Sequence, residues 1–274
     1  MSNIYFELTR EFNAAGVVAA LTSGQAVVYY RIAMMSKDGD WIVRETEAAT
    51  GRVLEVLACR GARYRAGAPL AVDWLRGGWS SHLVFHDPVG RRVRCDFFSR
   101  PPRLSSHEID ALFSAELPDD RLLVIGVEAL IRMKQTQRAQ DYPFVAGLAG
   151  LLPPEREIEL TTDPDRLLEL AGRFGGASPR PAVSAARDGD RRRVVIELAL
   201  EIDAMQQADR VRLARYARAA RGYLGEFQAR RVELTGLPLP EAHRRLVALA
   251  DKLLPRQLKE DGNGDAERGP AQHP

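Results

Sequence analysis

The sequence has few cysteines, few lysines and no long apolar segment. Its two cysteines, Cys59 and Cys95, are too few for a disulfide framework and lack the spacing of a metal site. No apolar run approaches the roughly 20 residues that a membrane helix needs. The first residues lack the basic and apolar regions of a signal peptide. We therefore expect no membrane association and a cytoplasmic location.

A strong excess of either charge is also lacking. The 274 residues include 39 Lys and Arg against 37 Asp and Glu, and the resulting net charge of +2 gives no whole-molecule argument for nucleic-acid binding. Basic charge is mostly arginine, since the lysines are only Lys37, Lys134, Lys252 and Lys259. A hydrophobic content of 45% is ordinary for a globular protein, and this length suffices for one large domain or two modest ones.

Helical and strand-like patterns alternate through residues 1–152. We expect helices at 5–15, 25–31, 47–60, 106–116 and 127–138, and strands at 17–21, 40–43, 63–65, 82–86, 93–98 and 122–125. The Pro/Gly turn at 87–91 predicts a hairpin between two of these strands. The alternation indicates an α/β (α+β) fold in which helices flank a mixed sheet.

Pro153 and Pro154 mark a predicted boundary, after which the pattern becomes mainly helical. We expect a helical C-terminal region at 153–255, with helices at 163–174, 192–230 and 240–254 and a linker at 175–181. Residues 256–274 are rich in Gly, Asp, Glu, Gln and Pro, which predicts a disordered tail.

The most informative segment is residues 36–43, Ser-Lys-Asp-Gly-Asp-Trp-Ile-Val. Side chains alternate along a strand, so Asp38 and Asp40 are expected to point to the same side. Carboxylates paired in this way can hold two Mg²⁺ ions bridged by nucleotide phosphates. The alternative is that the two acids are a solvated turn acid and a helix or strand cap.

A third carboxylate would complete such a site, and Asp96 is the best candidate. It is embedded in the expected strand 93–98, where a purely structural position would favour an apolar or neutral residue. Asp73 and Asp87 compete with it, although Asp87 precedes a proline in a turn, where aspartate is common for local reasons.

The Ser23-Gly24 pair opens an expected helix shortly before the carboxylates. Free backbone N–H groups at such a turn can bind a phosphate, which would place a phosphate site next to the metal ligands. A tight strand-to-helix connection is the alternative, because every α/β protein needs such turns.

These motifs, in this order, resemble the polymerase-β-like nucleotidyltransferase superfamily, and within it the minimal-type and AbiE-type toxin-like nucleotidyltransferases. Residues 23–26 resemble the family's Gly-Gly-x-Ala turn, with Ser23 in place of the first glycine, and residues 36–40 resemble its Thr-x-Asp-x-Asp. Residues 127–134, followed by Arg138 and Asp141, resemble its helix carrying a lysine before Arg-x-x-Asp. The resemblance covers roughly residues 5–150.

The resemblance implies a nucleotidyltransferase in which Asp38, Asp40 and Asp96 hold two Mg²⁺ ions and Ser23 and Gly24 bind the phosphates. Lys134 would contact the triphosphate or pair with Asp141. A nucleoside triphosphate such as ATP would supply the nucleotide, and RNA (a tRNA end) or a protein side chain would accept it. A toxin–antitoxin role is part of the same expectation.

A second hypothesis is a non-catalytic nucleotide-binding or antitoxin-like module that binds another protein through its helical C-terminal region. Arginines recur every third residue at 212–221, and the strip they form is either a contact for RNA phosphates or an ordinary solvated face. Scarce aromatic residues beside the strip favour the solvated face slightly. His82, His86, His107 and His243 lack metal-ligand spacing and are expected to be structural.

Overall fold

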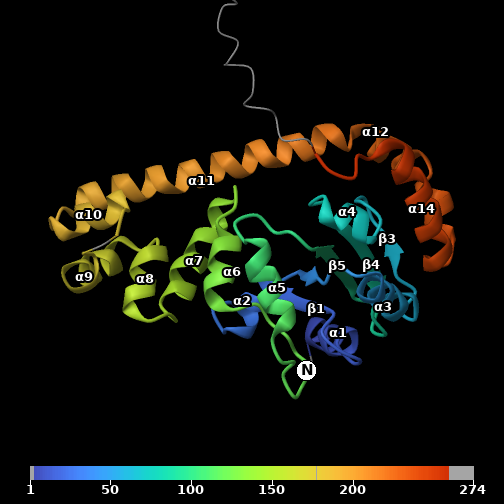
Figure 1. The fold of residues 1–274 in the computed structure, drawn as a ribbon, viewed down its shortest axis with the longest axis horizontal. Helices are drawn as coiled ribbons and strands as arrows, with labels where there is room; N and C mark the ends of the chain where they lie inside the picture. The colour runs from blue at the N-terminus through green and yellow to red at the C-terminus, as the bar shows by residue number, and fades with distance from the viewer. Residues whose placement is uncertain (1–2, 177, 259–274) are drawn as a thin grey trace, which may run out of the picture.

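A mixed sheet lies at the centre of the computed structural model, which describes residues 3–176 and 178–258 (Figure 1). Its strands are β1 (Ala19–Thr22), β2 (Asp38–Val43), β3 (Arg63–Tyr64), β4 (Ser81–His86) and β5 (Arg92–Phe98), in the order β1-β2-β5-β4-β3. Within this sheet β2 and β5 are parallel, and the other neighbouring strands are antiparallel. Residues from three separate segments therefore meet across the middle of the sheet.

Helices surround the sheet and then extend beyond it. The first group is α1 (Ile4–Phe12), α2 (Ser23–Tyr29), α3 (Glu47–Ala58), α4 (Val72–Arg76), α5 (Ser106–Ser114), α6 (Val127–Lys134), the 3₁₀ turn η1 (Ala139–Asp141) and α7 (Tyr142–Ala149). The second group is α8 (Pro154–Leu160), α9 (Pro164–Phe174), α10 (Pro181–Arg187), α11 (Arg191–Ala219), α12 (Arg221–Ala229), α13 (Arg231–Gly236) and α14 (Leu239–Leu253).

One face of the sheet, which we call the closed face, is covered by apolar packing. Trp41 and Phe97 stack at 5.2 Å between ring centroids, and Phe12 of α1 meets both rings edge-on. The same core takes in α3 and the last helices of the chain, including Leu246 of α14. Alternation along β2 and β5 therefore places every second residue in this core.

The opposite face, which we call the open face, is covered only in part. Ile42 packs under α2, α5, α6 and α7, together with Val27, Leu130 and Val145. Asp38 and Asp40 of β2, His82 of β4, and Arg94 and Asp96 of β5 lie on this same face outside that apolar cluster. This arrangement leaves room for a site on the open face.

Helix α11 is the longest element and spans the top of the molecule in Figure 1. Its first turns pack with α8, α9 and α10 in a separate apolar cluster, where Val194 and Leu198 are buried. At its other end, Tyr216 donates a hydrogen bond to the Gly77 carbonyl at 2.9 Å. The helix thus bridges the small helical cluster and the sheet.

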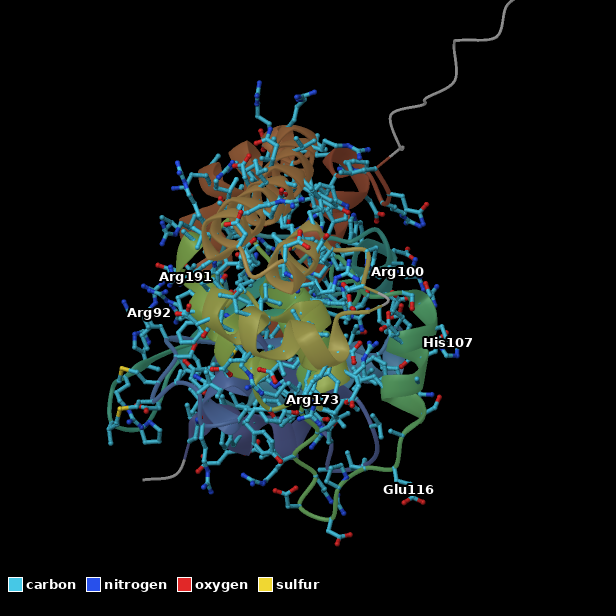
Figure 2. All side chains as sticks on the ribbon, turned by 90° about the vertical axis from the view of Figure 1, so that its left-hand side faces the viewer. Arg92, Arg100, His107, Glu116, Arg173 and Arg191 are labelled. Atoms are coloured by element: carbon cyan, nitrogen blue, oxygen red, sulfur yellow. The ribbon has the colours of Figure 1, made fainter. Side chains whose placement is uncertain are left out.

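Charged side chains cover the outside of the molecule (Figure 2). Arg92 of β5, Arg173 of α9 and Arg191 of α11 are labelled there, and Arg191 pairs with Asp165 at 2.8 Å. Among the described residues no helix is long and apolar enough to cross a membrane.

The expected fold class is confirmed, because helices flank a mixed sheet and the C-terminal region is mainly helical. Residues 122–125 differ from expectation, since they meet β1 only through one parallel bridge between Leu21 and Val124. The expected linker ends at Pro181, where α10 begins. The boundary after residue 152 stays a prediction, and residues 259–274 of the expected tail lie outside the described residues.

Candidate active site

The parallel pairing of β2 with β5 brings two of the predicted carboxylates together. Asp40 lies opposite Asp96 and Asp38 lies opposite Arg94, all four on the open face. Gly39, between the two aspartates, faces the other way. A Cβ at Gly39 would lie 2.4 Å from the Tyr5 ring and 2.5 Å from the Trp41 ring, so close packing requires glycine there.

A cavity of about 340 Å³ opens above these carboxylates. Its lining includes Asp38, Asp40, Asp96, Ser23, Gly24 and Lys134, which are all the site residues that the sequence predicts. The structure therefore brings these residues together from β2, β5, α2 and α6. What they bind is not settled by this proximity, so their roles stay predictions.

Asp40 is the least neutralised of the three carboxylates. Within residues 3–176 and 178–258 its carboxyl has no hydrogen bond or ion pair. Burial raises the pKa of Asp40 to about 7, the charges of Asp96 and Asp38 add to the rise, and Lys134 and Arg138 oppose it. A partly buried carboxyl beside two like charges is a place where a cation would relieve repulsion.

The pKa of Asp96 is shifted in the opposite direction. Burial alone would raise its pKa, but His82 and Arg65 outweigh burial and lower the pKa below its ordinary value. The Arg65 guanidinium pairs with Asp96 Oδ1. His82 Nδ1 lies 2.9 Å from the same oxygen, although the contact is poorly aligned for a hydrogen bond. Among residues 3–176 and 178–258, neither a hydrogen bond nor an ion pair reaches Asp96 Oδ2.

In the part of the chain that the structure describes, the Asp38 carboxylate pairs with one group, the Arg94 guanidinium, 3.1 Å from its Oδ1. Each of the three carboxylates thus keeps at least one oxygen without a partner among the described residues. Carboxylate oxygens are the donors that Mg²⁺ prefers, so the donor set suits such an ion. As the side chains stand, however, no three His, Cys, Asp or Glu residues in the described ranges are arranged to hold a metal ion. Rotation of the aspartates would be needed to bring their oxygens together.

Lys134 is buried, and its exposed fraction is only 6%. Its ammonium group lies 3.2 Å from Asp141 Oδ1 and 5.8 Å from the centre of the Phe144 ring. The other oxygen of Asp141 accepts hydrogen bonds from Thr136 and Arg138. The expected Lys134–Asp141 pair is therefore present, and it fixes a cation at the wall of the carboxylate cavity.

Ser23 and Gly24 are placed by a sharp strand-to-helix turn. Ser23 has a φ of 50°, in the left-handed region that favours glycine. A Cβ at Gly24 would lie 2.1 Å from Ser36 Oγ and 2.9 Å from Ser36 Cβ, so the Ser36 side chain already occupies that space. This tight turn, which the sequence also predicted, brings both residues to the cavity wall.

The two competing acids are elsewhere. Asp73, on α4, pairs with Arg256 at 2.8 Å. Asp87 closes the β4–β5 turn by accepting hydrogen bonds from the backbone N–H groups of Val89 and Arg91. Neither residue lines the carboxylate cavity, whereas Asp96 does.

Sequence reasoning missed three residues that surround the carboxylates, namely Arg65, His82 and Arg94. His82 was expected to be structural, and its position opposite Asp96 across β4 and β5 depends on the antiparallel register. Arg94 was findable, because it shares the strand face of Asp96 by alternation. Nothing in the sequence indicates that Arg65 reaches Asp96.

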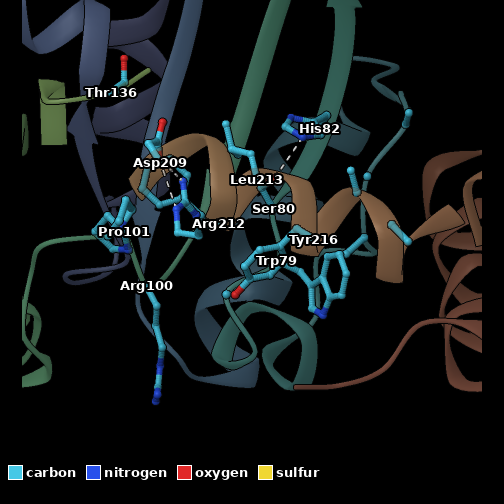
Figure 3. A pocket seen from close by; sticks show the side chains of 18 of the residues that line it. Trp79, Ser80, His82, Arg100, Pro101, Thr136, Asp209, Arg212, Leu213 and Tyr216 are labelled. Atoms are coloured by element: carbon cyan, nitrogen blue, oxygen red, sulfur yellow. Dashed lines mark hydrogen bonds and ion pairs between the residues drawn. The ribbon is translucent and has the colours of Figure 1, made fainter. Parts of the chain in front are cut away.

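A second, larger hollow of about 570 Å³, which we call the α11 cleft, lies beside the carboxylate cavity (Figure 3). Ser23 and Arg138 line both spaces, so the two are neighbours. Figure 3 shows Tyr216, Leu213 and Arg212 of α11 in the cleft, with Trp79, Ser80 and His82 also lining it.

Comparisons with known proteins add little. No protein-family model and no curated protein matches the chain. Among solved structures, the chain is similar to a "putative nucleotidyltransferase" from H. pylori, with a TM-score of 0.41 and 12% identity over 77% of this chain and 98% of that one. At this score and identity no residue role or activity is carried over, and the site is argued from its own geometry.

Proposed function

We propose that the protein is a magnesium-dependent nucleotidyltransferase, which moves a nucleoside monophosphate from a nucleoside triphosphate to a hydroxyl. The observation that carries this proposal is the carboxylate cavity. Three aspartates from two parallel strands share one face, with a buried lysine and a tight Ser-Gly turn at the same walls. Acids grouped with a cation around one cavity suit a triphosphate and its metal ions.

In this proposal Asp38, Asp40 and Asp96 would hold Mg²⁺, which would neutralise phosphate charge and lower the pKa of the attacking hydroxyl. Lys134, paired with Asp141 at 3.2 Å, would stand at a fixed position beside the triphosphate. Ser23 and Gly24 lie where a phosphate in the cavity would contact them. The acceptor oxygen bonds to the α-phosphorus, the bond from that phosphorus to the α,β-bridging oxygen breaks, pyrophosphate leaves and the hydroxyl proton passes to solvent.

The proposal is tested by incubating the protein with Mg²⁺, each α-labelled nucleoside triphosphate and total cellular RNA. We expect label on RNA, on a small product or on the protein, and no label with Asp40→Asn. Asp73→Asn is the matched control, because it removes an equal charge from α4 outside the cavity. Transfer that survives Asp40→Asn would contradict the assignment of the site.

A second candidate is a nucleotide-binding module without turnover, which associates with another protein. It is favoured by the contacts of Asp96, whose Oδ1 is already occupied by Arg65 and approached by His82. Binding of Mg²⁺-nucleotide without any labelled product would support this candidate. Isothermal titration of the same nucleoside triphosphates measures that binding directly.

A further inference from the structure

We propose that the α11 cleft binds the acceptor, and that the acceptor is an uncharged small molecule with an aromatic or apolar body and a free hydroxyl. This inference rests on the proposed nucleotidyl transfer and names its substrate class. It differs from the RNA or protein acceptor that the sequence resemblance implies.

The α11 cleft lies next to the carboxylate cavity. The cleft and the carboxylate cavity share Ser23 and Arg138 at their walls. His82 lines the cleft, while Asp96, 2.9 Å from its Nδ1, lines the cavity. A molecule seated in the cleft could therefore extend a hydroxyl past His82 to the carboxylates. A nucleotide in the cavity would present its phosphates from the other side.

Size and lining are a further argument. The volume of about 570 Å³ falls in the range of sites that bury a drug-sized molecule. The walls are mainly apolar and aromatic, with Leu213 and Tyr216 on α11 and Phe98 on β5. Polar side chains, among them His82 and Ser80, lie between them and can fix the orientation of an apolar ligand by hydrogen bonds.

The charges at the cleft disfavour a polyphosphate chain as the bound molecule. Each arginine at the cleft has a carboxylate partner among the described residues. Arg100 makes two hydrogen bonds to Glu45, Arg138 lies 3.0 Å from Asp141, and Arg212 lies 2.9 Å from Asp209. An RNA strand would have to compete with these pairs for each phosphate contact, whereas a neutral molecule would not.

The cleft is also fixed in shape. Helix α11 is held over it by the Asp209 carboxylate, which accepts a hydrogen bond from the Gln137 N–H at 3.0 Å, and by the Tyr216–Gly77 bond. The Trp79 ring meets Tyr216 edge-on, and its Nε1 donates to the Pro255 carbonyl at 2.7 Å. A preformed pocket under a tethered helix admits a small molecule more readily than a folded RNA.

The test compares two tryptophan substitutions on α11. Ala217 lines the cleft and is exposed, so Ala217→Trp fills the cleft without disturbing a core. Ala208 is also exposed but lies outside the cleft. Nine residues separate the two, which is two and a half helical turns, so Ala208→Trp places the same ring on the opposite side of the helix. Thermal unfolding confirms that both variants are folded.

Transfer is measured with α-labelled nucleotide and Mg²⁺ against two acceptor preparations, total cellular RNA and cell extract below about 1 kDa. We expect a labelled small product, at least about tenfold less of it with Ala217→Trp, and no change with Ala208→Trp. Affinity for Mg²⁺-nucleotide should be equal in all three proteins.

Three results would overturn the inference. Label on RNA or protein alone would contradict a small acceptor while leaving nucleotidyl transfer intact. A small product formed equally well by Ala217→Trp would place the acceptor outside the cleft. If nucleotide binds and no preparation is labelled, the proposed function fails and this inference fails with it.

Discussion

The two faces of β2 and β5 differ although the same strands form them. On the closed face, Trp41 and Phe97 are fully buried and stacked, and the Trp41 Nε1 donates a hydrogen bond to Thr9 at 2.8 Å. On the open face, one residue away along each strand, Asp40 and Asp96 lie side by side at a cavity. Backbone pairing is shared, so the difference lies in the side chains alone.

The two faces contribute differently to stability. Side chains on the closed face bury apolar surface in the core, which favours folding. Open-face acids place like charges next to each other in a partly buried cavity, which opposes folding until a cation or a proton relieves it. Polar groups gathered at a cost in stability are expected at a site that binds a ligand.

The largest loss of stability is expected at one of two adjacent phenylalanines of β5. Phe97 is fully buried on the closed face, whereas Phe98 is partly exposed at the α11 cleft. We expect Phe97→Ala to lower the free energy of unfolding by about 3–5 kcal/mol, because it leaves a cavity in a packed core. Phe98→Ala should cost about 1–2 kcal/mol, since it buries less area.

Urea-induced unfolding followed by circular dichroism measures both variants. The two substitutions remove the same atoms from neighbouring positions, so each is the control for the other. Equal losses would show that the two faces are packed alike. If Phe97→Ala lowers the free energy of unfolding only slightly, Phe97 is not part of the main core.

The second prediction concerns the pH dependence of Asp40. Its pKa is about 7 in the folded protein and near 3.8 when unfolded. Between these values the unfolded chain has lost the proton that the folded protein keeps, so wild-type stability falls as pH rises. The loss relative to Asp40→Asn should grow from pH 4 to pH 7, by at most about 1.4 kcal/mol per pH unit, and stay constant above pH 7.

Unfolding curves of wild type and Asp40→Asn at several pH values provide the measurement. The groups that face Asp40 are Asp38 and Asp96 on the strands, with Lys134 and Arg138 across the cavity. Added Mg²⁺ should recover stability in the wild type and not in Asp40→Asn, because an ion that binds only the folded protein stabilises it. Parallel pH profiles would mean that Asp40 is not perturbed.

The third prediction compares the two cations that pair with Asp141. Lys134 is buried, whereas the Arg138 side chain is about half exposed. Lys134→Met should lower the free energy of unfolding by about 2–4 kcal/mol, because it leaves Asp141 buried with one cation fewer. Arg138→Met should cost less than about 1 kcal/mol, since an exposed pair contributes little. A larger loss for Arg138→Met, in the same urea experiment, would contradict this.

Sequence reasoning found the parts of the site that depend on local pattern. Alternation put Asp38 and Asp40 on one side, and an acid within an apolar strand singled out Asp96. It did not find the partners of Asp96, since His82 faces Asp96 only in the actual register of the β4–β5 hairpin, and Arg65 reaches it only because β3 pairs with β4. It also missed α7 and α10, which are short and apolar and lack a clear helical period.

The smallest change in stability is expected at Ser23, in the turn beside the carboxylates on the open face. Ser23 has a φ of 50°, which costs a residue with a Cβ about 1 kcal/mol or more. Ser23→Gly removes this strain but adds freedom to the unfolded chain, so we expect a gain of at most about 1 kcal/mol. Ser23→Ala keeps the Cβ and should give no gain. Thermal unfolding distinguishes the two, and an equal gain from Ser23→Ala would mean that loss of the hydroxyl, rather than relief of the backbone, is responsible.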